Sequence, residues 1–418
     1  MSPSFPSDAT ATDAGSAAGI EGYICFSAQD WWYFNRGHSD FQLMLEVAAR
    51  RPVLLVNSIG MRMPTRSSTT QPMARIKRKL RSVWRGLRTP VEDRPGFHVF
   101  TPVFLPIYGD GRLAALNRLL ITLQVRAVQR WLRLGRCAVV VTLPTSWPIA
   151  RRIRRACTIA YRSDRYSSLP EADGPMVASL ERELLYSADV ACFASVALLE
   201  EESRLTRQPV LLSHGVDPDR FLLAADLAVH PCLRSIPGPK VGYVGMIDDY
   251  TVDLELLRAV ACALPSVQVV LAGPHDSDLR ALLALPNVHH IGMLPFEDVP
   301  SVMAGLDVAL LPWQDNEWIK HCNPIKLKEY LAVGLATVST DFPEVRRFAH
   351  VVDIARDRDG FVAMVADALV TGGRGDRQQR RAAASAESWS KQADLLMTLG
   401  EQSIRPELDE EELACAAS

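Results

Sequence analysis

Long hydrophobic runs are missing from this sequence of 418 residues. A membrane-spanning helix needs ~18 to 20 continuous apolar residues, whereas segments such as Val139–Leu143 soon meet proline or a charge. The first 20 residues also lack the cation and apolar core of a signal peptide, and are mainly Ser, Ala, Asp, Thr and Gly. We therefore predict a flexible tail over residues 1–21 and a cytoplasmic protein that does not cross a membrane.

Paired cysteines are equally absent, since none of the eight cysteines forms a C-x-x-C motif. In zinc sites and disulfide frameworks the cysteines are closer together or more regularly spaced than they are here. Several of the cysteines lie inside apolar runs, so we expect buried, reduced thiols.

Acidic residues are scarce in one part of the chain. From Val47 to Ser163 there are 23 Lys or Arg and only three acids, Glu92, Asp93 and Asp110. This segment carries an excess of 20 positive charges, which leaves −22 for the rest of a chain whose net charge is −2. A cationic surface of this size should face an anionic partner.

The overall composition is that of an ordinary globular protein, with 48% hydrophobic residues, 22% charged residues and a mean hydropathy of +0.03. Disordered chains have fewer apolar residues and a higher net charge, which excludes disorder as the main state. At ~100 to 200 residues per domain, the length favours two domains.

Short β-rich runs alternate with helical segments, which is typical of parallel sheets covered by helices. In the first half we predict strands at Tyr23–Ala28, Val53–Asn57, His98–Phe100, Ala138–Leu143, Thr158–Tyr161, Val190–Ala194 and Val210–Leu212. Helices are predicted at Phe41–Arg50, Leu113–Leu134 and Pro175–Ser187.

A proline-rich stretch predicts a linker over residues 226–239. Further strands are then predicted at Lys240–Gly245, Val267–Gly273, Val288–Ile291, Val308–Pro312 and Thr337–Thr340. We therefore predict an α/β protein with two tandem Rossmann-like, doubly wound domains, at 22–225 and 240–385, and a C-terminal helix and tail over 386–418. Such domains bind ligands in a crevice at the carboxyl ends of their strands.

The most informative segment is Asn323–Gly334. Pro324 suits the first turn of a helix, whose N-terminus offers free N–H groups to a phosphate. Lys326 in the same turn adds a positive charge, and Glu329 one turn later can accept two hydrogen bonds from a ribose diol. This arrangement suits a nucleoside diphosphate. Taken alone, the K-x-x-E spacing also fits a capped amphipathic helix with a solvated Lys and Glu.

The wider pattern resembles GT-B glycosyltransferases of bacterial envelope and exopolysaccharide synthesis, of the teichuronic-acid and xanthan glucuronosyltransferase types. The segments that carry the resemblance are Gly292–Glu344, Tyr243–Ile247, Asp253–Leu257, Leu271–Pro274, His214–Asp217 and, more loosely, Ser27–Trp31 with Arg36 and His38. The resemblance implies a GT-B fold and a nucleotide-sugar donor, by family habit a UDP-sugar. It places Glu329 on the donor ribose, Lys326 on the diphosphate, and Gly245 with Met246 in the loop beneath the phosphates and base. The donor-binding residues that it implies are Gly245, Met246, Ile325, Lys326, Glu329 and Tyr330.

The sequence departs from the commonest pattern of retaining members, E-x7-E, because the residue eight positions before Glu329 is His321. The Arg and Lys pair of those members is also missing after the strand that ends at Gly245. The resemblance therefore leaves the stereochemistry open, and Lys326 must carry more of the phosphate charge.

Attack by an acceptor hydroxyl needs a general base within hydrogen-bond reach. Asp164 is the first candidate because it follows a predicted strand into a loop that faces the crevice. The alternative for Asp164 is an ion pair with Arg162 or Arg165. His38 and His214 are further candidates for the base. The metal-binding string D-x-D occurs three times in unrelated predicted loops, so we predict no required metal and no cofactor.

Between Met73 and Arg88 apolar residues recur every three or four positions, and seven cations fill the other faces. The residues predicted to contact a membrane are Arg75, Lys77, Arg78, Lys79, Arg81, Trp84 and Arg85. Such a helix can lie in the interface of an anionic bilayer. The alternative is a helix packed on its own domain with a solvated basic face.

Together these features predict transfer of a sugar from a nucleotide donor to a saccharide or lipid-linked saccharide acceptor. The enzyme would act in envelope or exopolysaccharide synthesis, peripherally at the cytoplasmic face of an anionic plasma membrane. A nucleotide-sugar epimerase of the same fold is the alternative. A nucleic-acid-binding protein is suggested only by the cationic half, which has no recognisable nucleic-acid module, so no nucleic-acid partner is expected.

Overall fold

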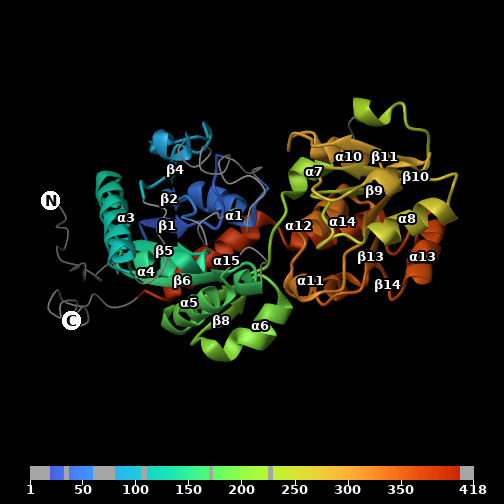
Figure 1. Ribbon diagram of the computed structural model, residues 1–418. Coiled ribbons are helices and arrows are strands. Elements are labelled where there is room, and N and C mark those ends of the chain that lie inside the picture. The colour runs from blue at the N-terminus through green and yellow to red at the C-terminus, as the bar shows by residue number, and fades with distance from the viewer. Residues whose placement is uncertain are drawn as a thin grey trace, which may run out of the picture.

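Two parallel sheets, each covered by helices, form two domains that lie side by side in the computed structural model (Figure 1). The structure describes residues 19–32, 37–59, 81–104, 111–168, 173–224 and 229–404. The strands read as short continuous apolar runs because both faces of a parallel sheet are buried. The predicted pair of Rossmann-like domains is therefore confirmed.

The first sheet contains all seven strands predicted in that half, with bounds shifted by a few residues. In spatial order its strands are β3 (Leu87–Arg88), β4 (Phe97–Phe100), β2 (Val53–Val56), β1 (Gly22–Phe26), β5 (Cys137–Val141), β6 (Cys157–Arg162), β7 (Val190–Phe193) and β8 (Pro209–Leu211). The strands from β4 to β8 pair in parallel. The exception is β3, an unpredicted edge strand that runs antiparallel to β4.

Helices cover both faces of this sheet. One face is covered by α1 (Ser39–Ala48) and the C-terminal α15 (Trp389–Gln402), and the other by α3 (Arg112–Trp131), α4 (Trp147–Ala150) and α5 (Gly174–Ser187). Helix α6 (Val196–Glu202) lies between β7 and β8 in the chain. Phe41 of α1 and Leu396 of α15 are fully buried in one apolar core. The chain therefore returns to the first domain after building the second.

The second sheet contains the five strands predicted after the linker. In spatial order its strands are β11 (Val288–Gly292), β10 (Gln268–Ala272), β9 (Lys240–Val244), β12 (Val308–Leu311), β13 (Ala336–Thr340) and β14 (Asp353–Ala355). One group of packed helices is α7 (Pro218–Ala224), α10 (Val299–Ala304), α12 (Ile325–Val333) and α14 (Arg377–Ala386). A second group is α8 (Leu254–Ala263), α9 (Arg280–Leu283) and α13 (Arg358–Thr371). Helix α11 (Glu317–His321) precedes α12.

Two chain segments cross between the domains and pair with each other. The Val216 N–H donates to the Glu387 carbonyl at 3.0 Å, and the Trp389 N–H donates to the Val216 carbonyl at 3.0 Å. A Cβ at Gly215 would lie 2.6 Å from the Trp389 nitrogen, so this close approach needs glycine. Phe221 of α7 is already buried in the second core. The first crossing therefore precedes the linker predicted at 226–239.

The basic segment Met73–Arg88 is described only from Arg81 onward. The contacts predicted at Arg75, Lys77, Arg78 and Lys79 fall outside the described residues. Residues 81–85 are helical, but Leu87–Arg88 form β3. The helix therefore ends before Arg88, where the sequence analysis had placed its end. Trp84 is 91% exposed, whereas the Arg85 guanidinium lies 4.5 Å from the centre of the Trp32 ring. No helix among the described residues is long and apolar enough to cross a membrane.

Candidate active site

The loop after β9 and the first turn of α12 form one wall of the candidate site. Gly245 has a φ of +147°, which favours glycine, and a Cβ there would lie 2.6 Å from Lys326 Nζ. Lys326 Nζ donates to Tyr243 Oη at 2.7 Å, and this hydroxyl donates to the Met246 carbonyl at 3.0 Å. Predicted donor residues from two distant segments therefore lie together.

Glu329 lies one turn further along α12 and is partly buried. Burial raises the pKa of its carboxyl to about 7, although Lys326 and Arg220 lower it. None of the described residues donates a hydrogen bond to this carboxylate. The neighbouring Tyr330 Oη accepts a hydrogen bond from the Val244 N–H at 2.9 Å, which fixes α12 against β9. The helix is thus held while the Glu329 carboxylate remains available to a ligand.

Two predicted site residues belong to the contact between the domains instead. Ile325 packs against the apolar core of the first domain. His214 is buried, and its Nδ1 lies 2.9 Å from the Asn323 carbonyl. Burial and the nearby Lys328 ammonium lower the pKa of His214 to about 3. The imidazole therefore takes part in the contact between the domains, and its role as a base stays a prediction.

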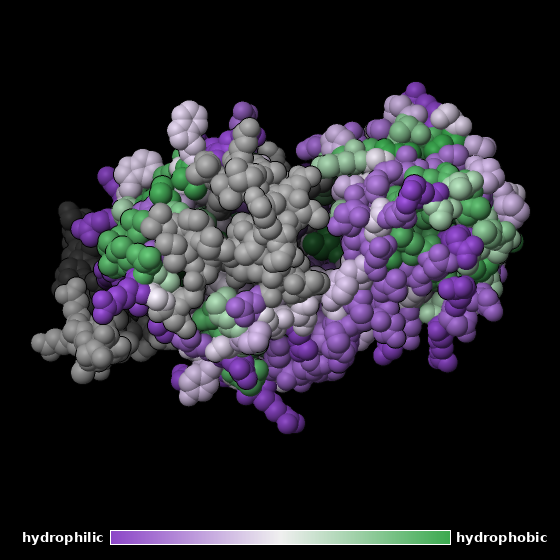
Figure 2. Space-filling view, in the orientation of Figure 1, coloured by the Kyte–Doolittle hydropathy of each residue, from purple (hydrophilic) through white to green (hydrophobic). Residues whose placement is uncertain are grey.

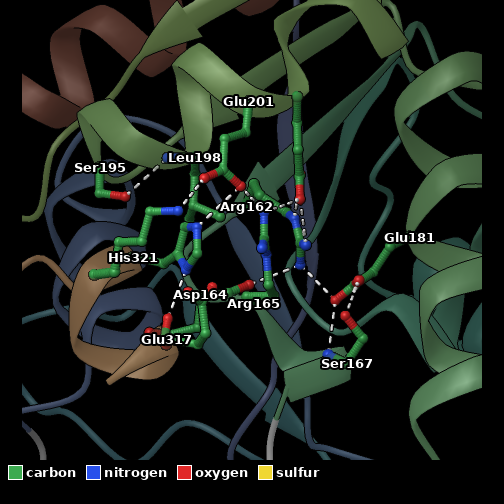
Figure 3. Close-up of polar contacts among 12 residues, drawn as sticks. Arg162, Asp164, Arg165, Ser167, Glu181, Ser195, Leu198, Glu201, Glu317 and His321 are labelled. Carbon is green, nitrogen blue, oxygen red and sulfur yellow. Dashed lines mark hydrogen bonds and ion pairs between the residues drawn. The ribbon is translucent and has the colours of Figure 1, made fainter. Parts of the chain in front are cut away.

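Asp164 follows β6 near the boundary between the domains (Figure 3). The Arg162 guanidinium donates to the Asp164 main-chain carbonyl at 2.7 Å, but forms ion pairs with Glu181 at 2.5 Å and Glu202 at 2.8 Å. Arg165 also pairs with Glu202, at 3.5 Å. Neither arginine pairs with the Asp164 carboxylate, which accepts no hydrogen bond from the described residues. The ion pair considered as its alternative role is therefore not formed.

Charged groups of both domains shift the pKa of one buried thiol. Burial raises the pKa of Asp164 to about 7, Arg162 lowers it and Asp40 raises it. Burial also raises the pKa of the Cys322 thiol. Asp164 raises this pKa further, and Lys326 lowers it. An acid of the first domain and Lys326 of the second therefore both shift the pKa of the same thiol. The surface is hollowed between the two domains (Figure 2).

Asp40, in the first turn of α1, was missed by the sequence analysis. Its buried carboxylate accepts hydrogen bonds from Ser27 Oγ at 2.5 Å and from the Ala28 N–H at 3.0 Å. Burial lowers the pKa of His38, and Asp40 opposes this effect. The spacing of His38 and Asp40 at a predicted helix start was the only signal for this pair. Asp40 also raises the pKa of Asp164, so the three titratable groups belong to one part of the first domain.

A buried polar cluster between the domains was also missed. Lys328 is fully buried, and its Nζ donates to Ser213 Oγ at 2.8 Å and pairs with Glu387 at 2.7 Å. Asn323 Nδ2 donates to Ser213 Oγ at 2.7 Å and to the Ala194 carbonyl at 2.6 Å. A lysine in a short helix gives no sequence signal for such burial, because lysine is normally exposed.

His321, at the E-x7-E position, makes a second contact between the domains (Figure 3). Its Nε2 lies 3.0 Å from Glu201 Oε2, and its Nδ1 lies 2.6 Å from the Glu317 carbonyl. Lys320 pairs with the same Glu201 at 2.7 Å. The position therefore links α11 of the second domain to α6 of the first.

The three D-x-D strings have local roles. Asp217 lies 3.6 Å from Arg220, Asp278 pairs with Arg280 at 2.6 Å, and Asp357 caps the N-terminus of α13. The described part of the chain contains no group of three or more His, Cys, Asp or Glu side chains placed to hold a metal ion.

Residues 238–372, which include the wall formed by Gly245, Lys326 and Glu329, match the family Glycosyl transferases group 1. This match falls on the second domain, which is similar to the group 1 glycosyltransferases. The chain is 25% identical over 241 residues to TuaH of Bacillus subtilis (strain 168). The name of that relative describes a glycosyltransferase of teichuronic acid biosynthesis. This match covers 54% of the chain and 60% of the length of that curated relative.

Solved structures share the arrangement of both domains. HepE of Anabaena, solved in complex with UDP, is 12% identical with a TM-score of 0.61, over 90% of this chain and 97% of that one. Sucrose-phosphate synthase of Thermosynechococcus elongatus is 14% identical with a TM-score of 0.66, over 95% of this chain and 100% of that one. This likeness shows the fold: the chain has the GT-B architecture that the resemblance implied.

Proposed function

We propose that this protein transfers a sugar from a nucleotide-sugar, in the first instance a UDP-sugar, to a saccharide or lipid-linked saccharide acceptor. The observation that carries the proposal is the wall where Lys326 Nζ donates to Tyr243 Oη at 2.7 Å beside Gly245, whose φ of +147° leaves room for close approach by a ligand. A transferase needs a base for the acceptor and a cation for the leaving diphosphate on opposite sides of one reaction centre.

The second domain supplies the donor site. The diphosphate would lie at the N-terminus of α12, where free N–H groups and Lys326 stabilise negative charge. Glu329 would accept two hydrogen bonds from the ribose diol. The loop at Gly245 lets main chain approach the nucleotide without a Cβ in the way. The UDP held by the GT-B structure HepE supports uracil as the base.

The first domain supplies the base. Asp164 would accept the proton of the acceptor hydroxyl while the hydroxyl oxygen bonds to the anomeric carbon of the donor sugar. The bond from that carbon to the phosphate oxygen breaks, and the nucleoside diphosphate leaves with its electron pair. A pKa of about 7 suits a base that works near neutral pH. His38, with Asp40 beside it, is the second candidate for this role.

The setting we propose is synthesis of an envelope or extracellular polysaccharide. The similarity to TuaH supports this setting. The cationic segment Val47–Ser163 supports an anionic surface or acceptor as the partner of the first domain. A peripheral position at the cytoplasmic face of the membrane would bring that domain to lipid-linked acceptors.

A thermal-shift screen with UDP-, GDP-, dTDP- and CMP-sugars tests donor binding, because a ligand that binds only the native state raises the melting temperature. Release of nucleoside diphosphate, dependent on an added saccharide acceptor, then tests transfer. Interconversion of the sugar without net release would support an epimerase instead. Absence of any shift, with salt-sensitive retention of nucleic acid on filters, would overturn the proposal.

A further inference from the structure

The outer side of α3 carries a row of exposed apolar side chains that the sequence analysis did not single out. Its members are Leu113, Leu116, Leu120, Leu123 and Trp131, here called the leucine row. Spacings of three, four and eight residues place them on one side of a helix. The leucines are 40% to 58% exposed and the tryptophan is 72% exposed. Apolar surface gathers over the end of the first domain where α3 lies (Figure 2).

The leucine row is separate from the side of α3 that packs on the sheet. Ile121 and Val125 are buried in the core of the first domain. The helix therefore has two apolar sides, and only one of them is covered by the core. Soluble monomers rarely leave a continuous apolar patch uncovered, so such a patch marks a docking surface.

Charge identifies what this surface docks on. Residues 111–136 contain six arginines and no acid: Arg112, Arg118, Arg126, Arg130, Arg133 and Arg136. Arginines of α3 also crowd those that follow α4. Burial lowers the pKa of Arg152, and so do the neighbouring charges of Arg151, Arg118 and Arg126. An anionic partner would relieve this repulsion between like charges.

We propose that the leucine row and the arginines of α3 form a docking surface for an anionic lipid bilayer. The leucines would enter the boundary between headgroups and acyl chains, while the guanidinium groups bind lipid phosphates. A second copy of the chain fits less well, because a symmetric dimer through this face would bring the two arginine sets together. Access to a lipid-linked acceptor rests on the proposed function, whereas vesicle binding itself does not.

Co-sedimentation with vesicles, without donor or acceptor, tests the surface. The wild type should sediment with phosphatidylglycerol-containing vesicles at low salt, and less with phosphatidylcholine alone or at high salt. Leu116→Ser with Leu120→Ser should reduce binding by about tenfold or more, because apolar burial is lost without a change in charge. Arg112→Glu with Arg130→Glu should reduce both binding and its salt dependence. The control Val370→Ser, at an 86% exposed apolar residue of α13, should bind like the wild type.

Three results would overturn the docking surface. The first is a wild type that remains in the supernatant with anionic vesicles at low salt. The second is a leucine variant that binds as well as the wild type, with Trp84→Ser losing binding instead. The third is a concentration-dependent dimer that the leucine variant abolishes. Because UDP affinity is measured separately by calorimetry and should be unchanged in the α3 variants, failure of vesicle binding and failure of the transferase assignment are distinguishable.

Discussion

Lys328 Nζ lies 2.7 Å from Glu387 Oε2 inside the contact between the two domains. Lys328 belongs to α12, the helix that also carries Lys326 and Glu329. Glu387 stands two residues before α15, which packs on the first domain. This ion pair therefore ties the helix of the candidate donor site to the domain that supplies the candidate base.

Breaking this ion pair should destabilise the protein. Burial lowers the pKa of Lys328, but the Glu387 carboxylate opposes this effect. Lys328→Met should cost about 3 to 5 kcal/mol, because it leaves a partly buried carboxylate with fewer partners. Calorimetric unfolding measures the loss. Arg280→Ala, which removes an exposed ion pair, is the matched control and should leave the free energy of unfolding close to that of the wild type.

Adding Glu387→Gln to Lys328→Met should recover part of that loss, because the uncompensated charge is then removed. A Lys328→Met protein as stable as the wild type would show that the buried ion pair does not hold the domains together.

Removing either donor-site side chain should weaken nucleotide binding without unfolding the protein. Lys326→Ala and Glu329→Ala each delete a charge-assisted interaction, typically ~1.5 to 3 kcal/mol, so UDP affinity should fall tenfold or more. Isothermal calorimetry measures the affinity. Lys391→Ala, at an exposed lysine of α15, should leave it unchanged. Wild-type affinity in both α12 variants would rule out this donor site.

Replacing the candidate base should slow turnover while donor binding is kept. Asp164→Asn keeps the shape of the side chain but cannot accept the acceptor proton, so kcat should fall by ~100-fold or more. The UDP affinity of the variant, measured in parallel, should remain close to that of the wild type. Unchanged turnover would remove Asp164 from the mechanism, and His38→Gln would then be the variant expected to slow it.

Activity should decline as the pH falls below neutrality. Burial raises the pKa values of Asp164 and Glu329 to about 7, above the ordinary range of carboxyl groups. Both groups act in their ionised form, so protonation below pH 7 should lower kcat/KM, with a logarithmic slope that approaches two. In Asp164→Asn the slope of the residual activity should approach one. A flat profile between pH 5 and 8 would contradict the assigned roles.

Sequence patterns predicted the elements of the fold because strand and helix periodicities are local properties. The apolar runs that became β9 and β12 are short and flanked by turn residues, which is enough to place them. The candidate donor wall could also be predicted from the sequence, since Lys326 and Glu329 are three residues apart on one helix and Gly245 ends a predicted strand. Helix propensity did not reveal that Leu87–Arg88 pair with β4, because strand pairing depends on a distant partner.

The sequence by itself determined two α/β domains, placed Lys326 and Glu329 one turn apart on α12, and made the first half strongly cationic. Only the tertiary structure decided which charges are buried: it enclosed Lys328 with Glu387, left the Asp164 carboxylate without a hydrogen-bond donor among the described residues, and joined Asp40 to Ser27. It also decided which side of α3 meets the core and which side leaves its leucines exposed. The physical reason is that burial and pairing depend on groups far apart in the chain. Apolar residues also recur along a helix with the same spacing whether that side of the helix is packed against the core or exposed to solvent.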